Sequence, residues 1–358
     1  MLKSLKLENF TVFPTADLGF GKHLNIIIGE NGTGKTHILK AAYSAIAVSA
    51  ARPKNGSSEA PNKAVFPTAL AEKFQGVFRP DTLGRLVRRG RGRGKCRLSY
   101  VFDRRQLNLE FTISTLAKVV VETMPTTREE KLPVYLPTRE LLSIAPSFVS
   151  IYETTRLEFE ETWRDTCVLL GAPLARGPRE QRIKQVLEPM EAAMGGKVEV
   201  DKAGRFYLTL DSGSMEVHLV AEGLRKLAMV ARLIATGSLL DKGYLFWDEP
   251  ESNLNPRIIK TVARTIMQVA QSGIQVFIGT HSLFLLRELH ILQKRDFRDF
   301  DTKCFGLHLG SDGAVTVQQG KTMDEIGDIA VLDEDLRQSD RYIETEMDLS
   351  VAPKEDGN

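Results

Sequence analysis

The chain has 358 residues, of which 42% are hydrophobic, enough for one large domain or two smaller ones with a substantial core. Its 48 Lys and Arg residues nearly balance 46 Asp and Glu residues, so bulk charge attracts neither nucleic acid nor a membrane surface strongly. The cysteines Cys96, Cys167 and Cys304 form no C-x-x-C pair, which argues against a disulfide framework or a zinc site and fits a reducing cytosol. We find no signal-peptide pattern and no run long enough to span a membrane, so we expect a soluble, cytoplasmic protein without a membrane partner.

The first part of the chain reads as strands followed by a helix. Residues 2–8 and 14–28 have apolar patterns that predict two or three β-strands, and a helical pattern continues from Thr36 to about Val48. Residues 51–62 are polar and rich in Pro, Gly and Ser, which is typical of a surface loop.

The segment from Gly29 to Thr36 fits the pattern G-x-x-x-x-G-K-[ST], between an apolar strand and a helix. Its glycines allow successive backbone N–H groups, with the positive end of the following helix, to converge on phosphate oxygens. Lys35 is expected to reach the β and γ phosphates of ATP, and Thr36 is expected to place its hydroxyl on Mg²⁺. The residues expected to contact the nucleotide are Gly29, Asn31, Gly32, Thr33, Gly34, Lys35, Thr36 and His37.

The next segment has β character, from Phe78 to Val121, and is interrupted by a basic run from Arg88 to Lys95. Two interpretations of this run are open. Clustered arginines neutralise phosphates, so it can contact DNA or another anionic partner. It can equally be the solvated, glycine-loosened tip of a hairpin.

The middle of the chain predicts a strand, a helical lobe and a hairpin. Residues 134–142 read as a strand and a turn, whose Arg139 and Glu140 either face a ligand or form a surface pair. Residues 150–195 are mostly helical by period, with Phe159 and Trp163 as expected core anchors, and no heptad pattern persists. Residues 197–201 and 205–210 predict a hairpin.

A second informative region begins with an apolar strand, residues 243–248, that ends in Asp248 and Glu249. An ionised carboxylate at the end of a buried strand needs a partner, and Mg²⁺ is a suitable one. Asp248 is therefore expected in the Mg²⁺ shell, and Glu249 is expected to orient and deprotonate the water that attacks the γ phosphate.

A second buried strand, residues 275–279, precedes His281, with a helix from about Arg257 to Gln271 between the two strands. If the strands are parallel, His281 lies at the same sheet edge as the phosphates and can hydrogen-bond the γ phosphate or the attacking water. We therefore place Glu249, His281 and Lys35 in the predicted catalytic group.

Taken together, the Gly29 to Thr36 loop, the run Asp248-Glu249-Pro250-Glu251-Ser252-Asn253-Leu254-Asn255-Pro256 and Thr280-His281-Ser282 resemble the ATP-binding-cassette (ABC) ATPases, in the branch of the SMC, RecF-like and OLD-type heads. The resemblance implies an α/β P-loop NTPase fold of the ABC type: a mixed central sheet with an antiparallel β layer and a helical lobe. It also implies that Glu249 is the catalytic base, that residues 251–255 are the D-loop and that His281 is the switch histidine.

Such proteins also carry a signature loop that closes over the γ phosphate of the opposite subunit. Its counterpart here is residues 220–226, at the head of a helix predicted through Leu240. Ala221 stands where the family usually has Ser, so contact in trans would depend on the Gly223 backbone, the helix dipole and Arg225 or Lys226, and we expect slow hydrolysis. No glutamine clearly matches the family's Q-loop; Gln106 is a candidate, and the turn at Arg139 is the alternative.

The resulting domain prediction is a single ABC-type domain over residues 1–358. It comprises a nucleotide-binding core (1–50 and 220–310), a β-rich arm (63–125), a helical lobe (140–195) and a C-terminal extension (311–358). The acidic cluster Asp333-Glu334-Asp335 is interpreted as part of a solvated tail rather than as a nuclease site.

Three functions are compatible with these patterns. The first, suggested by similarity to short bacterial ATPases of anti-phage defence systems, is a self-associating ATPase that controls an effector encoded nearby. The second is a RecF-like repair ATPase that binds DNA through the Arg88 to Lys95 run. The third is an ATP-gated scaffold with negligible turnover.

Overall fold

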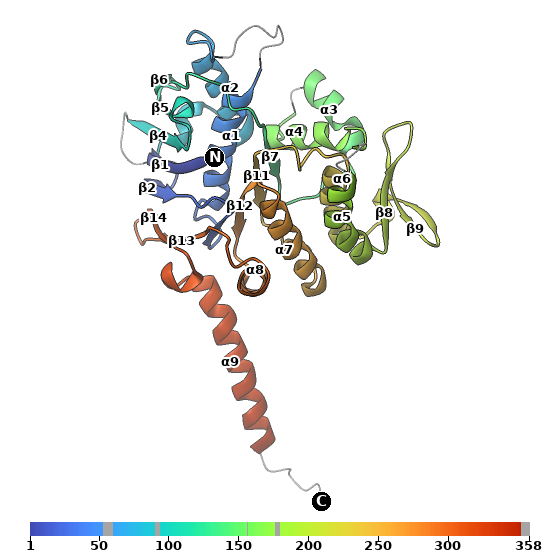
Figure 1. Cartoon of the computed structure of the whole chain (residues 1–358). Coiled ribbons are helices and arrows are strands. Elements are labelled where there is room, and N and C mark those ends of the chain that lie inside the picture. The colour runs from blue at the N-terminus through green and yellow to red at the C-terminus, as the bar shows by residue number, and fades with distance from the viewer. Residues whose placement is uncertain (53–59, 90–93, 156, 176–179, 352–358) are drawn as a thin grey trace, which may run out of the picture.

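A computed structural model describes residues 1–52, 60–89, 94–155, 157–175 and 180–351. Helices and sheets alternate in layers, and one long C-terminal helix extends away from the body (Figure 1). The helices of the described chain are α1 (Lys35–Ala50), α2 (Phe66–Phe78), α3 (Ala145–Thr154), α4 (Glu161–Leu170), α5 (Glu180–Met194), α6 (Glu222–Ala235), α7 (Pro256–Gln271), α8 (Leu283–Arg295) and α9 (Ala330–Val351).

The central sheet has six strands in the order β14-β13-β3-β12-β11-β7. Five of them run parallel and β14 is antiparallel to β13, so the predicted mixed sheet is confirmed. The inner strands are buried on both faces, which explains their continuous apolar sequences. The strands are β3 (Leu24–Gly29), β7 (Pro133–Leu136), β11 (Tyr244–Asp248), β12 (Gln275–Thr280), β13 (Thr302–Leu309) and β14 (Val315–Gly320).

The predicted antiparallel layer is a five-stranded sheet in the order β2-β1-β4-β5-β6. Helix α1 and one face of the central sheet share a hydrophobic core with this sheet, and helices α5 to α8 pack in a second core on the other face. Strand β3 alternates between the two cores: Ile27 faces the first, and Ile26 and Ile28 face the second. The strands are β1 (Leu2–Phe10), β2 (Phe13–Gly19), β4 (Lys95–Phe102), β5 (Leu109–Ser114) and β6 (Val119–Thr123).

The helical lobe consists of α3, α4 and α5, followed by a small antiparallel sheet in the order β10-β9-β8. Its strands are β8 (Gly196–Val200), β9 (Phe206–Leu210) and β10 (Gly213–Glu216), so the predicted hairpin is present with one further strand. Phe159, predicted as a core anchor, is 42% exposed, and Trp163 is partly buried. Phe148 is the buried ring against which both of them pack.

The structure adds detail to three further predictions. The segment 63–125, expected to be a β-rich arm, contains helix α2 and strands β4 to β6, and β4 pairs directly with β1 of the antiparallel sheet. The signature helix ends at Ala235 rather than at Leu240, because Gly237 turns the chain with a positive φ of 71°. The segment 311–358, expected to be an extension, supplies β14 to the central sheet before α9 begins.

The side chain of Gln275, at the start of β12, joins the two large sheets. It is 1% exposed, accepts a hydrogen bond from Leu2 N (3.0 Å) and donates to Leu2 O and Gly21 O (both 2.8 Å). Replacing it with Leu removes the partner of the Leu2 N–H and carbonyl, each loss costing on the order of 1–3 kcal/mol, while Gly21 O keeps its hydrogen bond from the Asn25 amide at 3.1 Å.

We therefore expect Gln275→Leu to lower the free energy of unfolding by about 3 kcal/mol, measured by urea denaturation. The control is Gln271→Leu, because Gln271 is exposed at the end of α7. Equal losses of stability in the two variants would contradict this role of Gln275.

Candidate functional site

The loop from Gly29 to Thr36 connects β3 to α1 and curls as the sequence predicts. Gly32 and Gly34 have positive φ values of 83° and 94°, a backbone region that favours glycine. Asn31 and Gly32 are exposed at the loop tip, and Gly34 is the N-cap of α1. The first backbone N–H groups of α1 therefore point toward the hollow of the loop, as an anion site requires.

Two of the predicted nucleotide contacts have side chains that are not free: Thr33 is buried and His37 is half-buried. Thr33 is 1% exposed and its hydroxyl donates to Glu30 O at 2.8 Å, so this side chain braces the loop. The ring of His37 lies against Phe78, and burial lowers its pKa to about 4, which keeps it neutral. Both the hydroxyl and the N–H of Thr33 are therefore engaged with Glu30 O, the N–H at 3.4 Å, and His37 presents a neutral, half-buried ring.

Lys35 is buried at 5% exposure and folds back onto the loop. Its Nζ donates to the carbonyls of Gly29 (2.9 Å) and Glu30 (3.0 Å). Burial lowers the pKa of Lys35, and the nearby carboxylates of Glu249 and Asp248 oppose that shift. An ammonium held only by carbonyls in such a position is ready to exchange them for phosphate oxygens.

Asp248 ends strand β11 directly beside α1. Its Oδ2 accepts a hydrogen bond from the Thr36 hydroxyl at 2.7 Å, while Oδ1 is buried and accepts none from the described residues. Burial raises the pKa of this carboxyl, which is the behaviour of an acid that lacks its counter-charge.

Glu249 and His281 meet as predicted, because β11 and β12 are parallel neighbours with Asp248 opposite Gly279. Glu249 Oε1 lies 3.2 Å from His281 Nδ1, an ion-pair distance without hydrogen-bond alignment, and Oε2 accepts from the Ser252 hydroxyl at 3.1 Å. His281 lowers the pKa of Glu249 to about 2, and Glu249 in turn raises the pKa of His281.

The segment 251–255, predicted to be the D-loop, packs on the head of α6. The Asn253 amide donates to Glu222 Oε1 at 2.9 Å. A Cβ on Gly223 would lie 2.6 Å from the Asn253 carbonyl oxygen. Glycine at position 223 is therefore required by a close approach within the same chain, whatever its role toward a second subunit.

The structure places Arg225 and Lys226 differently from the sequence prediction. Arg225 Nε lies 2.9 Å from Glu140 Oε1, and the Lys226 ammonium is buried against the carbonyls of Glu249 and Ser252. Neither side chain is directed outward for a phosphate in trans. Glu140 is also not part of a surface pair, since it is 8% exposed, whereas Arg139 is exposed.

Two contacts in the site were not anticipated, and one candidate residue is exposed. The Tyr135 hydroxyl, from β7, lies 3.4 Å from Asp248 Oδ2. A Cβ on Gly279 would lie 3.2 Å from Asp248 Oδ1, so a small residue is needed there. Gln106, the candidate Q-loop residue, is exposed between β4 and β5 of the antiparallel sheet.

The residues present fit a Mg²⁺–triphosphate. Thr36 and the unpartnered Oδ1 of Asp248 offer oxygen ligands, and the loop offers N–H groups and Lys35 for phosphates. The described residues contain no group of three His, Cys, Asp or Glu side chains that could hold a metal by themselves. Mg²⁺ is typically held by one or two protein ligands together with substrate phosphates and water, so this sparse arrangement suits it.

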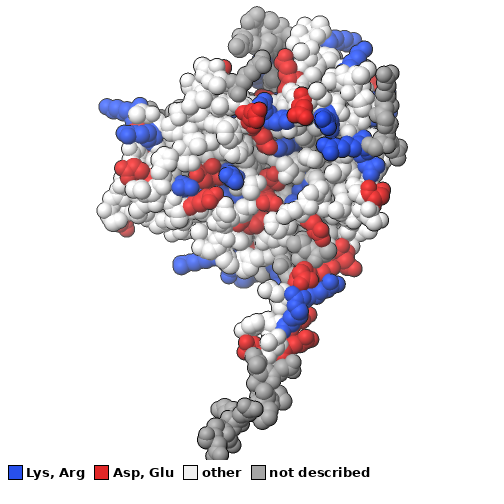
Figure 2. Space-filling model, turned by 180° about the vertical axis from the view of Figure 1, so that it is seen from behind, with Lys and Arg blue, Asp and Glu red and all other residues white. Residues whose placement is uncertain are grey.

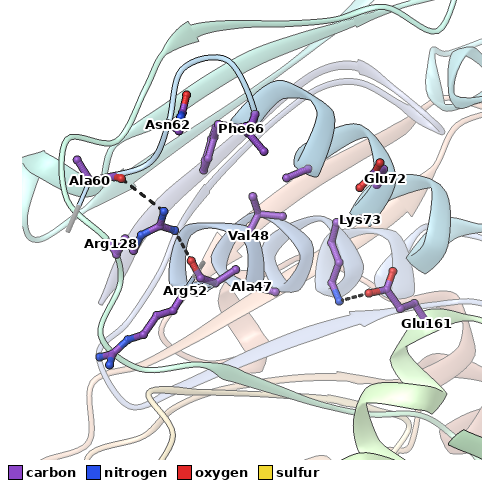
Figure 3. A pocket seen from close by; sticks show the side chains of 13 residues that line it. Ala47, Val48, Arg52, Ala60, Asn62, Phe66, Glu72, Lys73, Arg128 and Glu161 are labelled. Atoms are coloured by element: carbon purple, nitrogen blue, oxygen red, sulfur yellow. Dashed lines mark hydrogen bonds and ion pairs between the residues drawn. The ribbon is translucent and has the colours of Figure 1, made fainter. Parts of the chain in front are cut away.

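A pocket of about 660 Å³ lies elsewhere in the described structure. Figure 3 shows it between α1 and α2, with Val48 and Phe66 on its walls and Lys73 directed toward Glu161. It lies beside Ala47, near the end of α1 opposite the phosphate loop and roughly 18 Å along that helix from Lys35. It is therefore separate from the site described above.

Two family models match the chain. The model described as "AAA domain, putative AbiEii toxin, Type IV TA system" matches residues 128–287, and a model described as "AAA domain" matches residues 4–67. The second region contains the phosphate loop, and the first contains Asp248, Glu249 and His281.

Similarity to individual proteins covers a short stretch of the chain in sequence and most of the chain in fold. The chain is 43% identical over 42 residues to the DNA replication and repair protein RecF of Exiguobacterium sp. and 46% identical over 43 residues to that of Agathobacter rectalis. These matches cover 12% of this chain and 11% and 12% of those proteins.

Solved SMC heads share the fold over most of the chain. The SMC head bound to the C-terminal winged-helix domain of ScpA matches with a TM-score of 0.54 and 13% identity, over 90% of this chain and 98% of that one. A second match is the Pyrococcus furiosus SMC head with an extended coiled coil, bound to the C-terminal domain of ScpA. Its TM-score is 0.52 and its identity 11%, and the match covers 97% of this chain and 99% of that one.

The fold is that of a P-loop ATPase of the ABC type. Within that class, the chain is similar to SMC heads in fold and to RecF over a short stretch of sequence. No described helix has both the length and the apolar character needed to cross a membrane.

The contact between His281 and Glu249 can be tested by histidine NMR titration. Glu249→Gln removes the interaction that raises the pKa of His281 and leaves the burial that lowers it, so its titration midpoint should move to lower pH. Glu222→Gln is the control, because Glu222 hydrogen-bonds Asn253 instead. An unchanged midpoint in Glu249→Gln would show that the two side chains do not interact in solution.

Proposed function

We propose that this protein binds ATP with Mg²⁺ and hydrolyses it. The observation that carries the proposal is the convergence of Lys35 and Thr36 with Asp248, Glu249 and His281 at one edge of the central sheet. Ligands of open α/β sheets bind at the carboxyl ends of the strands, which is where these side chains lie.

Each residue has a distinct role in this proposal. Lys35 and the loop N–H groups bind and orient the β and γ phosphates, while Thr36 and Asp248 hold the metal. When bound, Mg²⁺ neutralises charge that develops on the phosphate oxygens. A carboxylate whose pKa is about 2 is a weak proton acceptor, so Glu249, while paired with His281, acts first by orienting the attacking water.

Self-association is the second part of the proposal. The head of α6 lies next to the D-loop, and Leu219 just before it is 72% exposed. A single exposed apolar side chain is common on protein surfaces, so this part of the proposal rests on the resemblance of residues 220–226 to a signature loop and on the packing of α6 against the D-loop. We propose that a second copy closes the site through the head of α6, with Gly223 near the γ phosphate of the opposite subunit.

The catalytic assignment predicts different effects for two variants. Glu249→Gln should lower kcat for ATP hydrolysis by about 100-fold or more while retaining ATP binding. Lys35→Ala should weaken ATP binding about 10-fold or more, because it removes a charge-assisted hydrogen bond. Phosphate release and equilibrium binding of labelled ATP measure the two effects.

The matched control is Lys260→Ala, an exposed lysine on α7 whose side chain is 62% accessible. It should change neither quantity. If Glu249→Gln hydrolyses ATP at the wild-type rate, the assignment of Glu249 is wrong; negligible turnover by the wild type would favour the ATP-gated scaffold instead.

We further propose that the protein is the sensor or regulatory subunit of an anti-phage defence system, controlling a separate toxic effector or nuclease. The family model over residues 128–287, whose description names a putative AbiEii toxin of a type IV TA system, supports this proposal. ATP binding between two copies offers a physical means of holding or releasing an effector.

This role predicts phage resistance that depends on the ATP site. Cells carrying the gene together with its neighbouring open reading frame should form fewer phage plaques, and Lys35→Ala or Glu249→Gln should change that protection. Lys260→Ala should behave as the wild type. Protection that is the same in all four forms would exclude control by ATP.

A RecF-like function in DNA repair is the alternative, and the RecF matches over 42 and 43 residues favour it. The expected DNA contact is weakened by the structure, because Arg88 is 16% exposed and lies 3.9 Å from Asp312. Arg89 and Lys95 are exposed, and residues 90–93 of the run lie outside the described residues. On the face shown in Figure 2, basic and acidic side chains are interspersed. Salt-dependent binding to duplex DNA would distinguish this alternative.

A further inference from the structure

The backbone of Glu249 has an unfavourable conformation. Its φ is +46°, in the left-handed region that side-chain-bearing residues rarely adopt, and Asn253 follows with +62°. Such a conformation costs on the order of 1–3 kcal/mol and persists only where the surroundings fix it. On one side of the residue, Glu249 N donates to Gly279 O at 2.9 Å.

On the other side, the Glu249 carbonyl is held by Lys226. The ammonium of Lys226 donates to Glu249 O at 2.6 Å and to Ser252 O at 3.3 Å, so it bridges both ends of the turn that carries the candidate base. Ser252 N also donates to Glu249 O, at 3.2 Å, and Ser252 is the residue whose hydroxyl contacts the Glu249 carboxylate.

Lys226 is an unusual residue to bury. It is 2% exposed, and burial lowers its pKa to about 8 although the carboxylates of Glu251, Glu249 and Asp248 act in the opposite direction. Removing an ammonium from water costs several kcal/mol, which apolar packing alone would avoid. Two carbonyl contacts on a strained turn give the charge a specific use at this position.

We propose that Lys226 is a positioning residue for ATP hydrolysis: its ammonium fixes the turn from Glu249 to Ser252 and so directs the Glu249 carboxylate toward His281. This inference rests on the proposed ATPase function. Lys226 belongs to α6, so the same contact ties the candidate base to the helix whose head is expected to meet the second subunit.

Two other contacts join the head of α6 to the D-loop. The Asn253 amide is bonded to Glu222, and Gly223 packs against the Asn253 carbonyl without room for a Cβ. A subunit that docks on the head of α6 therefore acts on the Glu249 turn through Lys226, and the presence of a partner is transmitted to the candidate base within one chain.

Helix α6 provides a matched control. Arg232 is also a buried cation, 5% exposed, that donates to two backbone carbonyls, those of Leu170 (3.2 Å) and Ala172 (2.7 Å). Its contacts are in the helical lobe, away from Glu249. Lys226→Met and Arg232→Met each remove a buried charge from the same helix, but only the first removes it from the turn.

The first test uses the nucleotide-free full-length protein. Hydrogen–deuterium exchange over residues 249–255 should be about tenfold faster in Lys226→Met than in the wild type, and unchanged in Arg232→Met. Equal exchange over 249–255 in Lys226→Met and the wild type would overturn the proposal. If Lys226→Met does not fold, Lys226→Gln, which keeps a neutral donor, is measured instead with the same expectation.

The second test separates kcat from ATP binding. Lys226→Met should lower kcat by about 100-fold with the dissociation constant for ATP within about threefold of the wild type, and Lys226→Arg should recover part of the rate. Arg232→Met should lower the melting temperature without this loss of kcat. A loss of kcat that only follows thermal stability in both variants would reduce Lys226 to a structural anchor.

The two proposals fail in different ways. If the wild type hydrolyses ATP, Glu249→Gln does not, and Lys226→Met does, only the role of Lys226 is wrong. If the wild type does not hydrolyse ATP at all, the proposed function fails, and the exchange measurement still decides whether Lys226 fixes the turn.

Discussion

The hydrogen bond between Thr36 and Asp248 depends on the architecture of the whole central sheet. It joins the first turn of α1 to the end of β11, two elements more than 200 positions apart in the chain (|i−j| = 212). The bond can form only because β3, β12 and β11 are parallel and in register, with Thr280 opposite Ile28 and Gly279 opposite Asp248. The buried apolar strands fix this register, and the polar residues at their carboxyl ends are brought together as a consequence.

The sequence was most informative where local geometry and chemistry coincide. Glycines at positions 32 and 34, followed by Lys35 and Thr36, predict a phosphate loop because this spacing is specific to such loops. The positive φ values of both glycines agree with that prediction. The adjacency of Glu249 and His281 was predictable because strands with such apolar sequences are usually parallel in α/β proteins. By contrast, Phe159 and the end of α6 were mispredicted, since periodicity shows which residues are apolar but not which neighbour covers them.

Contacts between distant segments could not be derived in the same way. From sequence, the lysine at the end of the signature loop is expected to be available to an anion, and only the packing of α6 on the D-loop turns it inward. Gly223 presents the same difficulty. A glycine is required at this position because the Asn253 carbonyl, distant in sequence, lies too close for a Cβ, and no local sequence pattern indicates that contact. Tyr135, hidden in an apolar strand, reaches Asp248 only after β7 has paired with β11.

The head of α6 also bears on how firmly two copies would hold a nucleotide. Ala221 is its N-cap and supplies no side-chain hydrogen bond, so the first N–H groups of the helix remain available to an anion. Glu222 lies in that first turn, where its negative charge opposes an approaching triphosphate even though its carboxylate is engaged by Asn253. A backbone-only contact beside a carboxylate is weaker than one reinforced by a hydroxyl or an arginine. In the proposed two-copy arrangement, contact with the opposite nucleotide would therefore depend on the backbone at the head of α6, the same helix whose Lys226 holds the strained Glu249 turn.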